Sequence, residues 1–296
     1  KETHSNPHLL PNITLPEEVC FTNDFQEIVA FSPEIIILAT PSQFLRSTLQ
    51  KTPVSLWNRP ELLAVVNVAK GIEENTLKTL DAVIKDELPF LEEHKICALS
   101  GPSHAEEVAR KIPTTVVIAG SDEDLLCYLQ TVFSNSYFRV YRNLDLIGVE
   151  IGGAVKNIIA IAAGIIYGLD FGDNTIGALL TRGIVEIQRL GIALKALPET
   201  FLGLSGIGDL ITTATSLHSR NRFVGVEIGK GRKLSDILAQ MEMVAEGVTT
   251  TRSVYLLSRK LRIEMPIVEK VYQVLYEDKE PRKAILELMT RELKAE

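Results

Sequence analysis

Residues 62–69 read Leu-Leu-Ala-Val-Val-Asn-Val-Ala and are followed directly by Lys70 and Gly71. The apolar residues are continuous rather than alternating, which is typical of a strand buried on both faces, as in a parallel sheet covered by helices. Similar apolar runs lie on either side, at residues 35–39 and 96–99, and residues 75–88 between them have helical spacing. The sequence therefore predicts an α/β fold with a doubly wound, Rossmann-like sheet.

The two halves of the chain differ in their sequence patterns. Residues 114–119 and 138–141 extend the strand pattern, but no strand-like run follows residue 145. The remainder reads as helices separated by Gly and Pro, at residues 146–167, 178–196, 219–229, 234–240, 248–261, 267–276 and 281–294. We therefore expect a dinucleotide-binding domain over residues 1–145 and an all-helical substrate-binding and catalytic domain over residues 146–296.

The start of the predicted nucleotide-binding domain departs from its usual pattern. Such a domain should open with a strand, a G-x-G-x-x-G turn and a helix. This chain opens instead with a loop-like segment over residues 6–12, and the glycines at 203, 206 and 208 lie in the helical half and follow no strand. We expect the opening βαβ unit, on the order of 30 residues or more, to be absent from the sequence, so the nucleotide domain is N-terminally incomplete and cofactor binding is weakened.

Bulk properties limit the classes of partner. The 296 residues carry a formal net charge of -7 and are 46% hydrophobic, which suits a chain with a substantial core and argues against a broad nucleic-acid surface. No run reaches the roughly 18 uninterrupted apolar residues of a membrane span, and no secretory signal is visible. Three widely spaced cysteines and scattered histidines indicate reduced thiols and no metal site. We expect a cytoplasmic protein without a nucleic-acid partner, a metal or an integral membrane segment.

Lys156 lies in the segment Gly-Gly-Ala-Val-Lys-Asn at residues 152–157. Helical spacing surrounds it with aliphatic and small side chains. One interpretation is a lysine at the end of a core helix whose amine reaches solvent. The other is a desolvated lysine whose pKa is low enough to accept and return a proton near neutrality. The paired glycines favour close approach of a ligand or another backbone.

Two further polar groups follow predicted strands, and the carboxyl ends of strands in open α/β sheets are where ligands bind. Lys70 comes directly after residues 62–69, and residues 100–104, Ser-Gly-Pro-Ser-His, come after residues 96–99 and open a helix. Free N–H groups at such a point suit phosphate or carbonyl oxygens. The ordinary alternatives are a solvated lysine and, at Ser103, a capping box with Glu106.

The densest polar cluster spans residues 206–213 and continues at residues 219–222, Ser-Arg-Asn-Arg. Asp209 lies among glycines and aliphatic residues, and its burial without a partner is costly, so we expect a nearby lysine or a substrate hydroxyl. The hydroxyl, guanidinium and amide of Ser-Arg-Asn suit a phosphate, although a solvated helix cap is the plainer alternative. Glu246 precedes a predicted helix, where it favours the helix dipole.

The order of these segments resembles that of the bacterial NAD(P)-dependent glycerol-3-phosphate dehydrogenases. Any one piece is weak, but many pieces in order along essentially the whole chain are specific. The matching pieces are residues 68–73, 99–103, 138–141, 152–157, 206–210, 219–222, 264–267 and 271–276.

The resemblance implies a reversible hydride transfer between NAD or NADP and C2 of dihydroxyacetone phosphate, giving sn-glycerol 3-phosphate for phospholipid synthesis. Lys156 would be the proton donor and acceptor, and a homodimer is implied. The small phosphorylated three-carbon substrate is expected around Lys70, Gly101, Ser103, Lys156, Asp209, Ser219, Arg220 and Asn221, with Arg220 and Asn221 on the phosphate. Cofactor contacts are implied at Lys70, Ala105, Arg220, Val244 and Glu246.

Two alternatives remain open from the sequence. One is another phospho- or hydroxyacid dehydrogenase of the same architecture, against which the Ser-Arg-Asn segment at residues 219–221 weighs. The other is a catalytically silent, truncated remnant that serves as a binding or dimerising module; Lys156 and Asp209 weigh against it, and the absent glycine-rich turn weighs for it.

Overall fold

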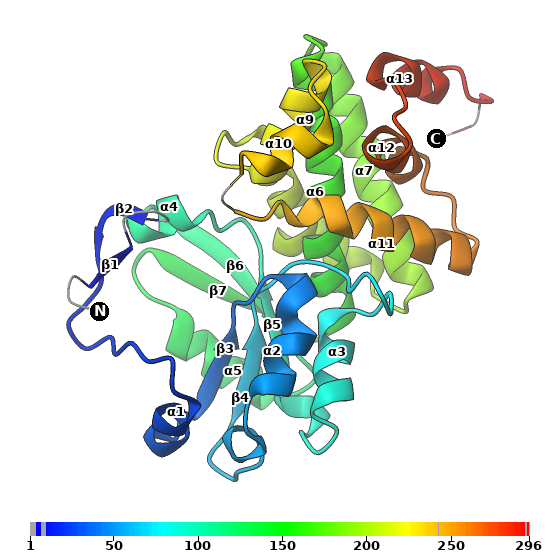
Figure 1. Ribbon diagram of the computed structural model, residues 1–296. Helices are drawn as coiled ribbons and strands as arrows, with labels where there is room; N and C mark the ends of the chain where they lie inside the picture. The colour runs from blue at the N-terminus through cyan, green and yellow to red at the C-terminus, as the bar shows by residue number, and fades with distance from the viewer. Residues whose placement is uncertain (1–3, 7–9, 242, 294, 296) are drawn as a thin grey trace.

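The computed structural model describes residues 4–6, 10–241, 243–293 and 295. Its centre is a five-stranded sheet of order β3–β4–β5–β6–β7 (Figure 1). The strands are β3 (Ile35–Leu38), β4 (Ala64–Asn67), β5 (Ile96–Ser100), β6 (Thr114–Ala119) and β7 (Phe138–Asn143). β3, β4 and β5 are mutually parallel and β6 is parallel to β7, but the β5–β6 pair is antiparallel. The predicted α/β sheet is confirmed, and it is mixed at one junction.

Helices cover both faces of this sheet, which explains the continuous apolar runs. Val65 packs on the side of α2 and α3, whereas Ala64 and Val66 pack on the side of α5, since successive side chains of a strand point to opposite faces. All three are fully buried. The helices of this half are α1 (Phe25–Phe31), α2 (Leu45–Lys51), α3 (Leu80–Glu87), α4 (Ala105–Ala109) and α5 (Glu123–Phe133).

Two local predictions are wrong in this half. The helix predicted from residue 75 begins only at Leu80, because Leu77 adopts a left-handed backbone with φ of 61° and residues before it form a loop. The N-terminal segment predicted as a loop contains two short strands, β1 (Ser5–Asn6) and β2 (Leu10–Thr14), which pair antiparallel. Residues 7–9 of that segment lie outside the described residues.

After β7, every regular element among the described residues is a helix or a helical turn. Its helices are α6 (Leu146–Gly168), α7 (Asp173–Ala193), α8 (Asp209–Thr215), α9 (Arg220–Gly229), α10 (Leu234–Ala239), α11 (Glu246–Leu261), α12 (Pro266–Tyr276) and α13 (Pro281–Met289), with short turns η4 (Pro198–Leu202) and η5 (Leu204–Gly208) before α8. The sequence analysis missed α8 as a helix, and the helix predicted over residues 281–294 ends at Met289; residue 294 lies outside the described residues.

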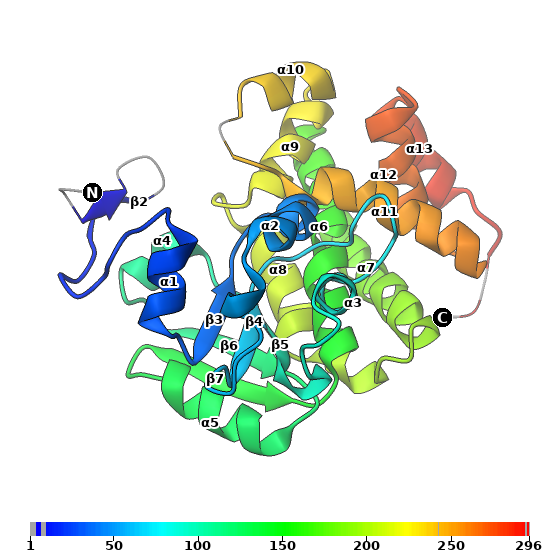
Figure 2. The ribbon, with the colours of Figure 1, turned by 60° about the horizontal axis from the view of Figure 1, so that its bottom comes forward.

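The helix α6 lies at the centre of the helical half and contacts most of its other helices. It runs from the sheet into the helical half, as Figures 1 and 2 show, and packs against α7, α8, α9 and α11 as well as β5. A helix that is apolar on all sides belongs in a core. Among the described residues α6 alone has the length and composition to cross a membrane, and its apolar stretch is entirely buried within the protein.

Candidate functional site

Three charged side chains meet where α6 abuts the sheet. Lys156 Nζ, from α6, donates to Asp209 Oδ1 at 2.5 Å and to Thr213 Oγ1 at 2.6 Å. Lys70 Nζ, from the end of β4, donates to the other oxygen, Asp209 Oδ2, at 2.7 Å and to the carbonyl of Gly101 at 2.9 Å. Asp209 is 2% exposed and Lys156 is 5% exposed. One buried carboxylate thus holds two lysines, and the partner expected for Asp209 is confirmed.

Burial and the neighbouring charges set the protonation of this group. Burial lowers the pKa of the Lys156 amine to about 7; Asp209 opposes this effect and Lys70 adds to it. Burial acts to raise the pKa of the Asp209 carboxyl, but the two lysines outweigh it and the pKa lies below its usual value. At neutral pH the carboxylate is therefore charged, while the Lys156 amine is poised to gain or lose a proton.

Paired glycines bring α6 close enough to form this centre. A Cβ on Gly152 would lie 2.7 Å from the carbonyl oxygen of Ser205, and a Cβ on Gly153 would lie 2.7 Å from Ser100 Oγ. The close approach predicted from the glycine pair is confirmed. It presses α6 onto η5 and the end of β5, so that Lys156 reaches Asp209 at the start of α8.

The segment after β5 forms one wall of the centre. Gly101 has φ of +127°, a conformation that suits glycine, and its carbonyl faces Lys70. Ser103 is exposed and its Oγ donates to the same carbonyl at 3.1 Å. The capping box predicted for Ser103 is wrong, because His104 occupies the N-cap of α4 and no side chain bonds there. Ala105 is the exposed first residue of α4.

Two buried polar atoms near this wall lack a partner. Ser100 Oγ and His104 Nε2 make no hydrogen bond within the part of the chain that the structure describes. Burial lowers the pKa of His104, and Lys156 lowers it further, which places the ring in the field of the lysine. Because buried polar atoms are normally hydrogen-bonded, these two mark a place that a polar ligand would complete.

Asn221 links three helices beside Lys156. Its Nδ2 donates to Asn157 Oδ1 at 2.9 Å, and its Oδ1 accepts from the backbone N–H of Gly247 at 2.9 Å. Asn157 directly follows Lys156 on α6, and Gly247 directly follows Glu246 on α11. This bridge fixes the start of α9 against α6 and α11.

The neighbouring residues of α9 remain more open. Ser219 is the N-cap of α9, and its Oγ accepts from the backbone N–H of Arg222 at 3.2 Å. The exposed Arg220 donates from Nη1 to the carbonyl of Val244 at 2.8 Å. This bond uses one of the five guanidinium N–H donors of the exposed side chain.

Glu246 joins the helical half to the sheet. Its Oε1 accepts from the backbone N–H of Ser42 at 2.9 Å, and its other oxygen accepts from the Ser42 hydroxyl. Ser42 is 1% exposed and follows β3. The sequence analysis missed Ser42, although its position after an apolar strand was a usable signal. Glu246 therefore does more than favour the dipole of α11.

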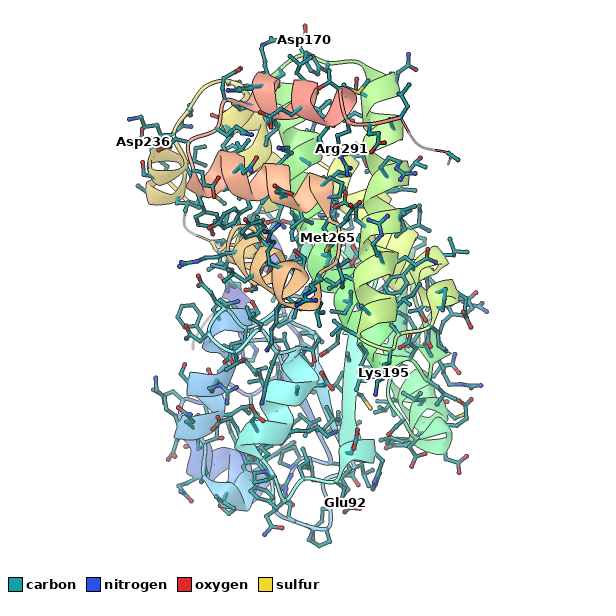
Figure 3. The ribbon with its side chains drawn as sticks, turned by 90° about the vertical axis from the view of Figure 1, so that its right-hand side faces the viewer. Glu92, Asp170, Lys195, Asp236, Met265 and Arg291 are labelled. Carbon is teal, nitrogen blue, oxygen red and sulfur yellow. The ribbon has the colours of Figure 1, made fainter. Side chains whose placement is uncertain are left out.

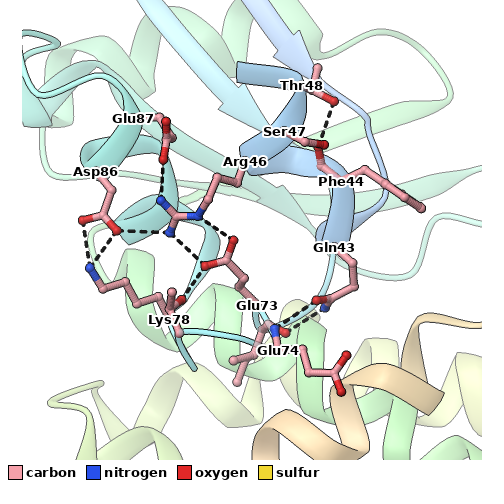
Figure 4. A network of polar contacts seen from close by, with 12 residues as sticks. Gln43, Phe44, Arg46, Ser47, Thr48, Glu73, Glu74, Lys78, Asp86 and Glu87 are labelled. Atoms are coloured by element: carbon pink, nitrogen blue, oxygen red, sulfur yellow. Dashed lines mark hydrogen bonds and ion pairs between the residues drawn. The ribbon is translucent and has the colours of Figure 1, made fainter. Parts of the chain in front are cut away.

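A polar network holds the loop that carries Lys70 (Figure 4). The Arg46 guanidinium makes two contacts of 2.8 Å with Glu73 and also contacts Asp86 at 3.1 Å and Glu87 at 2.5 Å. The Gln43 amide donates to the carbonyl of residue 72 and accepts from the backbone N–H of residue 74, both at 2.9 Å. The Arg46 hydrogen bonds lower the pKa of Glu73, so the pair stays charged. None of these contacts was predicted.

Other reactive side chains lie apart from this centre. The cysteines Cys20, Cys97 and Cys127 are unpaired thiols, and burial raises the pKa of Cys97 to about 12. Among the described residues, no group of three or more His, Cys, Asp or Glu side chains is arranged to hold a metal ion.

Comparison with known proteins agrees with the arrangement of the two halves. The family model for the NAD-dependent glycerol-3-phosphate dehydrogenase N-terminus matches residues 1–126, and that for the C-terminus matches residues 145–286. Glycerol-3-phosphate dehydrogenase [NAD(P)+] of Geobacter sp. (strain M21) is 50% identical over 296 residues, which is 100% of this chain and 87% of that relative.

Solved structures give the same result. The glycerol-3-phosphate dehydrogenase of Coxiella burnetii superposes with a TM-score of 0.89 at 34% identity, covering 95% of this chain and 84% of that one. The yeast glycerol-3-phosphate dehydrogenase superposes with a TM-score of 0.80 at 26% identity, covering 97% of this chain and 84% of that one.

Proposed function

The chain belongs to the family of NAD-dependent glycerol-3-phosphate dehydrogenases, and we propose that the buried lysine Lys156 carries the proton in its reaction. The chain is an oxidoreductase that interconverts sn-glycerol 3-phosphate and dihydroxyacetone phosphate with NAD(P)(H), supplying glycerol phosphate for phospholipid synthesis. Membership of this family sets aside the other dehydrogenases. The observation that carries the proposal is the single carboxylate, Asp209, shared by Lys156 and Lys70.

Proton transfer at Lys156 follows from its surroundings. Reduction of the substrate carbonyl leaves negative charge on the C2 oxygen, which a protonated Lys156 amine stabilises and then protonates. Such a step is worth roughly 10²–10⁴-fold in rate. A pKa near the working pH lets the same amine act as acid in reduction and as base in oxidation. Asp209 keeps the buried amine from losing its proton altogether.

The phosphate is assigned to the start of α9. Arg220 has guanidinium donors left after its bond to Val244, and a planar guanidinium suits phosphate oxygens. The Asn221 amide has a second hydrogen beyond the one given to Asn157. Ser219 adds a hydroxyl, and we place Ser103 and the Gly101 backbone on the opposite side of the substrate.

The residues at the carboxyl end of β3, β4 and β5 fit the nicotinamide end of the cofactor. When bound, that cofactor supplies or accepts the hydride. The unpartnered Ser100 Oγ and His104 Nε2 are consistent with a polar ligand here. We propose that cofactor contacts come from Lys70, Ala105, Arg220, Val244 and Glu246. A strand followed by a glycine-rich turn and a helix does not occur among the described residues.

The experiment that tests the role of Lys156 is a substitution with a matched control. Lys156→Ala should lower kcat by at least about 10²-fold while circular dichroism and cofactor binding stay unchanged. Lys51→Ala, at an exposed lysine of α2 far from the centre, should leave kcat unchanged. Near-normal turnover of Lys156→Ala would remove Lys156 from the mechanism.

Three coarser features are also proposals. The division near residue 145 is supported by the end of the last strand at Asn143 and the start of α6 at Leu146; hydrogen exchange should resolve two units of different stability. The homodimer implied by the family resemblance calls for light scattering. A cytoplasmic location, supported by the unpaired cysteines, calls for cell fractionation.

A further inference from the structure

A second concave region lies in the helical half, away from Lys156. A cavity of about 300 Å³ opens between α7 and the α12–α13 pair, over the C-terminal part of α6. Its walls are mostly aliphatic, with Ile165 from α6, Leu179 from α7, Val271 from α12, and Ile285 and Leu288 from α13. Pockets of this size with apolar walls and few polar groups are typical small-molecule sites.

A polar cavity adjoins the apolar one. It has a volume of about 550 Å³ and lies between the end of α11 and α12. The two cavities share four wall residues, Glu264, Pro266, Lys270 and Arg291. Figure 3 looks onto this side of the molecule and labels Arg291 and Met265 there. An apolar compartment that continues into a polar one suits a ligand with a chain and a headgroup.

The charges around the cavities favour an anion. The polar cavity is lined by four cations, Arg259, Arg262, Lys270 and Arg291, and by three carboxylates, Glu264, Glu269 and Glu287; Arg182 lines the apolar cavity. Within the described ranges, the side chains of Arg182, Arg259 and Arg262 have no hydrogen-bond or ion-pair partner.

The carboxylates nearby are largely engaged already. Glu287 is bound by both Lys270 and Lys279, at 2.5 Å each. Glu186 is 3% exposed and accepts from the backbone N–H groups of Ile267 at 2.8 Å and Val268 at 3.3 Å, at the start of α12. Arg291 contacts Glu264 at 3.6 Å. Arg259 and Arg262 are therefore left as the cations of the polar cavity that are available to a ligand.

We propose that the joined cavities bind a single-chain phosphate amphiphile, with its acyl chain between α7 and α13 and its phosphate against Arg259 and Arg262. Acylation of the glycerol 3-phosphate that this enzyme forms gives a molecule of this class, so the ligand is a downstream derivative of its product. The apolar cavity has room for about ten groups of water size at roughly 30 Å³ each, which suits a chain of medium length. Arginine is the side chain best matched to phosphate oxygens.

Binding is tested directly on the purified full chain. Titration calorimetry with 1-decanoyl-glycerol 3-phosphate, kept below its micelle concentration, should give one molecule bound per chain. Leu179→Trp fills the apolar cavity and Arg262→Glu reverses a headgroup charge, and each should weaken binding at least tenfold. Arg139→Glu, the same charge reversal on β7, should leave binding unchanged. Thermal unfolding identifies a variant that fails to fold. If Leu179→Trp fails to fold, the test still rests on Arg262→Glu, because Arg262 is exposed.

Three outcomes overturn the proposal. Loss of amphiphile binding in Arg220→Ala, or its displacement by free glycerol 3-phosphate, would place the ligand in the catalytic centre instead. If decanoate binds as tightly as the phosphate amphiphile, the phosphate is not recognised and that part of the proposal is wrong. In the third outcome, the affinity for the amphiphile is unchanged in both cavity variants, and light scattering shows that these variants dissociate from a dimer. This face would then be a contact between two copies of the chain. The wild-type turnover rate, measured without amphiphile, reports separately on the catalytic proposal.

Discussion

Asp209→Asn tests whether one carboxylate sets the proton affinity of Lys156. The substitution keeps the size of the side chain and removes the charge that lies 2.5 Å from Lys156 Nζ and 2.7 Å from Lys70 Nζ. In the native protein Asp209 raises the pKa of Lys156, while burial and Lys70 lower it. Without the carboxylate only the lowering influences remain, so the pKa of Lys156 must fall below its present value of about 7.

The size of this fall follows from the geometry. Opposite charges about 4 Å apart at an effective dielectric constant of about 20 attract by about 4 kcal/mol, which corresponds to about 3 pKa units. The protonated fraction of Lys156 at pH 7 would then drop from about one half to about one in a thousand. Since the protonated amine is the donor in reduction, kcat for dihydroxyacetone phosphate reduction at pH 7 should fall by about 10²–10³-fold.

The assay is the pH dependence of that reduction, followed by loss of NADH absorbance. The native rate should be high below pH 7 and decline as the pH rises through about 7. In Asp209→Asn this decline should move to lower pH, so the deficit should shrink by about tenfold for each unit of acidification. Stability should fall by less than the roughly 3–5 kcal/mol of a broken buried ion pair, because Lys156 can lose its proton near pH 7 at little cost.

Asp145→Asn is the matched control. Asp145 is also a buried carboxylate, 8% exposed, but it caps α6 and accepts from Gly148, Leu197 and Thr200 rather than from a lysine. It should lower stability and leave the pH midpoint of the rate unchanged. If Asp209→Asn keeps the native midpoint and loses less than about fivefold in kcat, the link between Asp209 and the Lys156 proton is refuted.

Three other outcomes are expected. Burial raises the pKa of Glu186 to about 7 from 4.5, so its stabilising contribution is complete below pH 4.5 and is lost as pH rises through about 7; Glu186→Gln should remove up to about 3 kcal/mol of pH dependence from chemical unfolding curves. Gly225→Ala would place a Cβ 2.0 Å from the carbonyl oxygen of Ile161 and should destabilise by at least about 2 kcal/mol in thermal melts, whereas Gly177→Ala, with nothing within 4 Å, should be neutral or slightly stabilising. Arg220→Ala should raise KM for dihydroxyacetone phosphate at least tenfold and change kcat less, since it removes a charge-assisted phosphate contact; an unchanged KM in steady-state assays would take Arg220 off the phosphate.

Most helices and strands of the chain could be predicted from its sequence. The continuous apolar runs predicted strands buried on both faces, and the five-stranded sheet has helices on both. The apolar segment around Lys156 predicted a core helix, which α6 is. These predictions succeed because periodicity and apolar content report directly on which faces of an element are removed from water.

The predictions from sequence were wrong where backbone geometry, or contacts with residues far away along the chain, decided the local structure. The left-handed Leu77 delays the start of α3, and the capping box expected at Ser103 did not form, because α4 begins one residue later, with His104 as its N-cap. The antiparallel β5–β6 pair was invisible, since an apolar run carries no strand direction. Arg46 and Ser42 were missed because their partners, Glu73 and Glu246, are 27 and 204 residues away along the chain.

The sequence by itself determined that Lys156 would lie on an apolar helix, because the spacing of its neighbours is helical. It also determined that a buried Asp209 would need a lysine or a substrate hydroxyl as partner, because a charge among aliphatic side chains is costly. It left open whether that lysine would reach solvent or lose its hydration. Only the tertiary structure decided this, by pressing α6 onto η5 and β5 through Gly152 and Gly153 and bringing Lys156 and Lys70 to one carboxylate. A pKa depends on burial and on charges within a few ångströms, and those are properties of the folded chain.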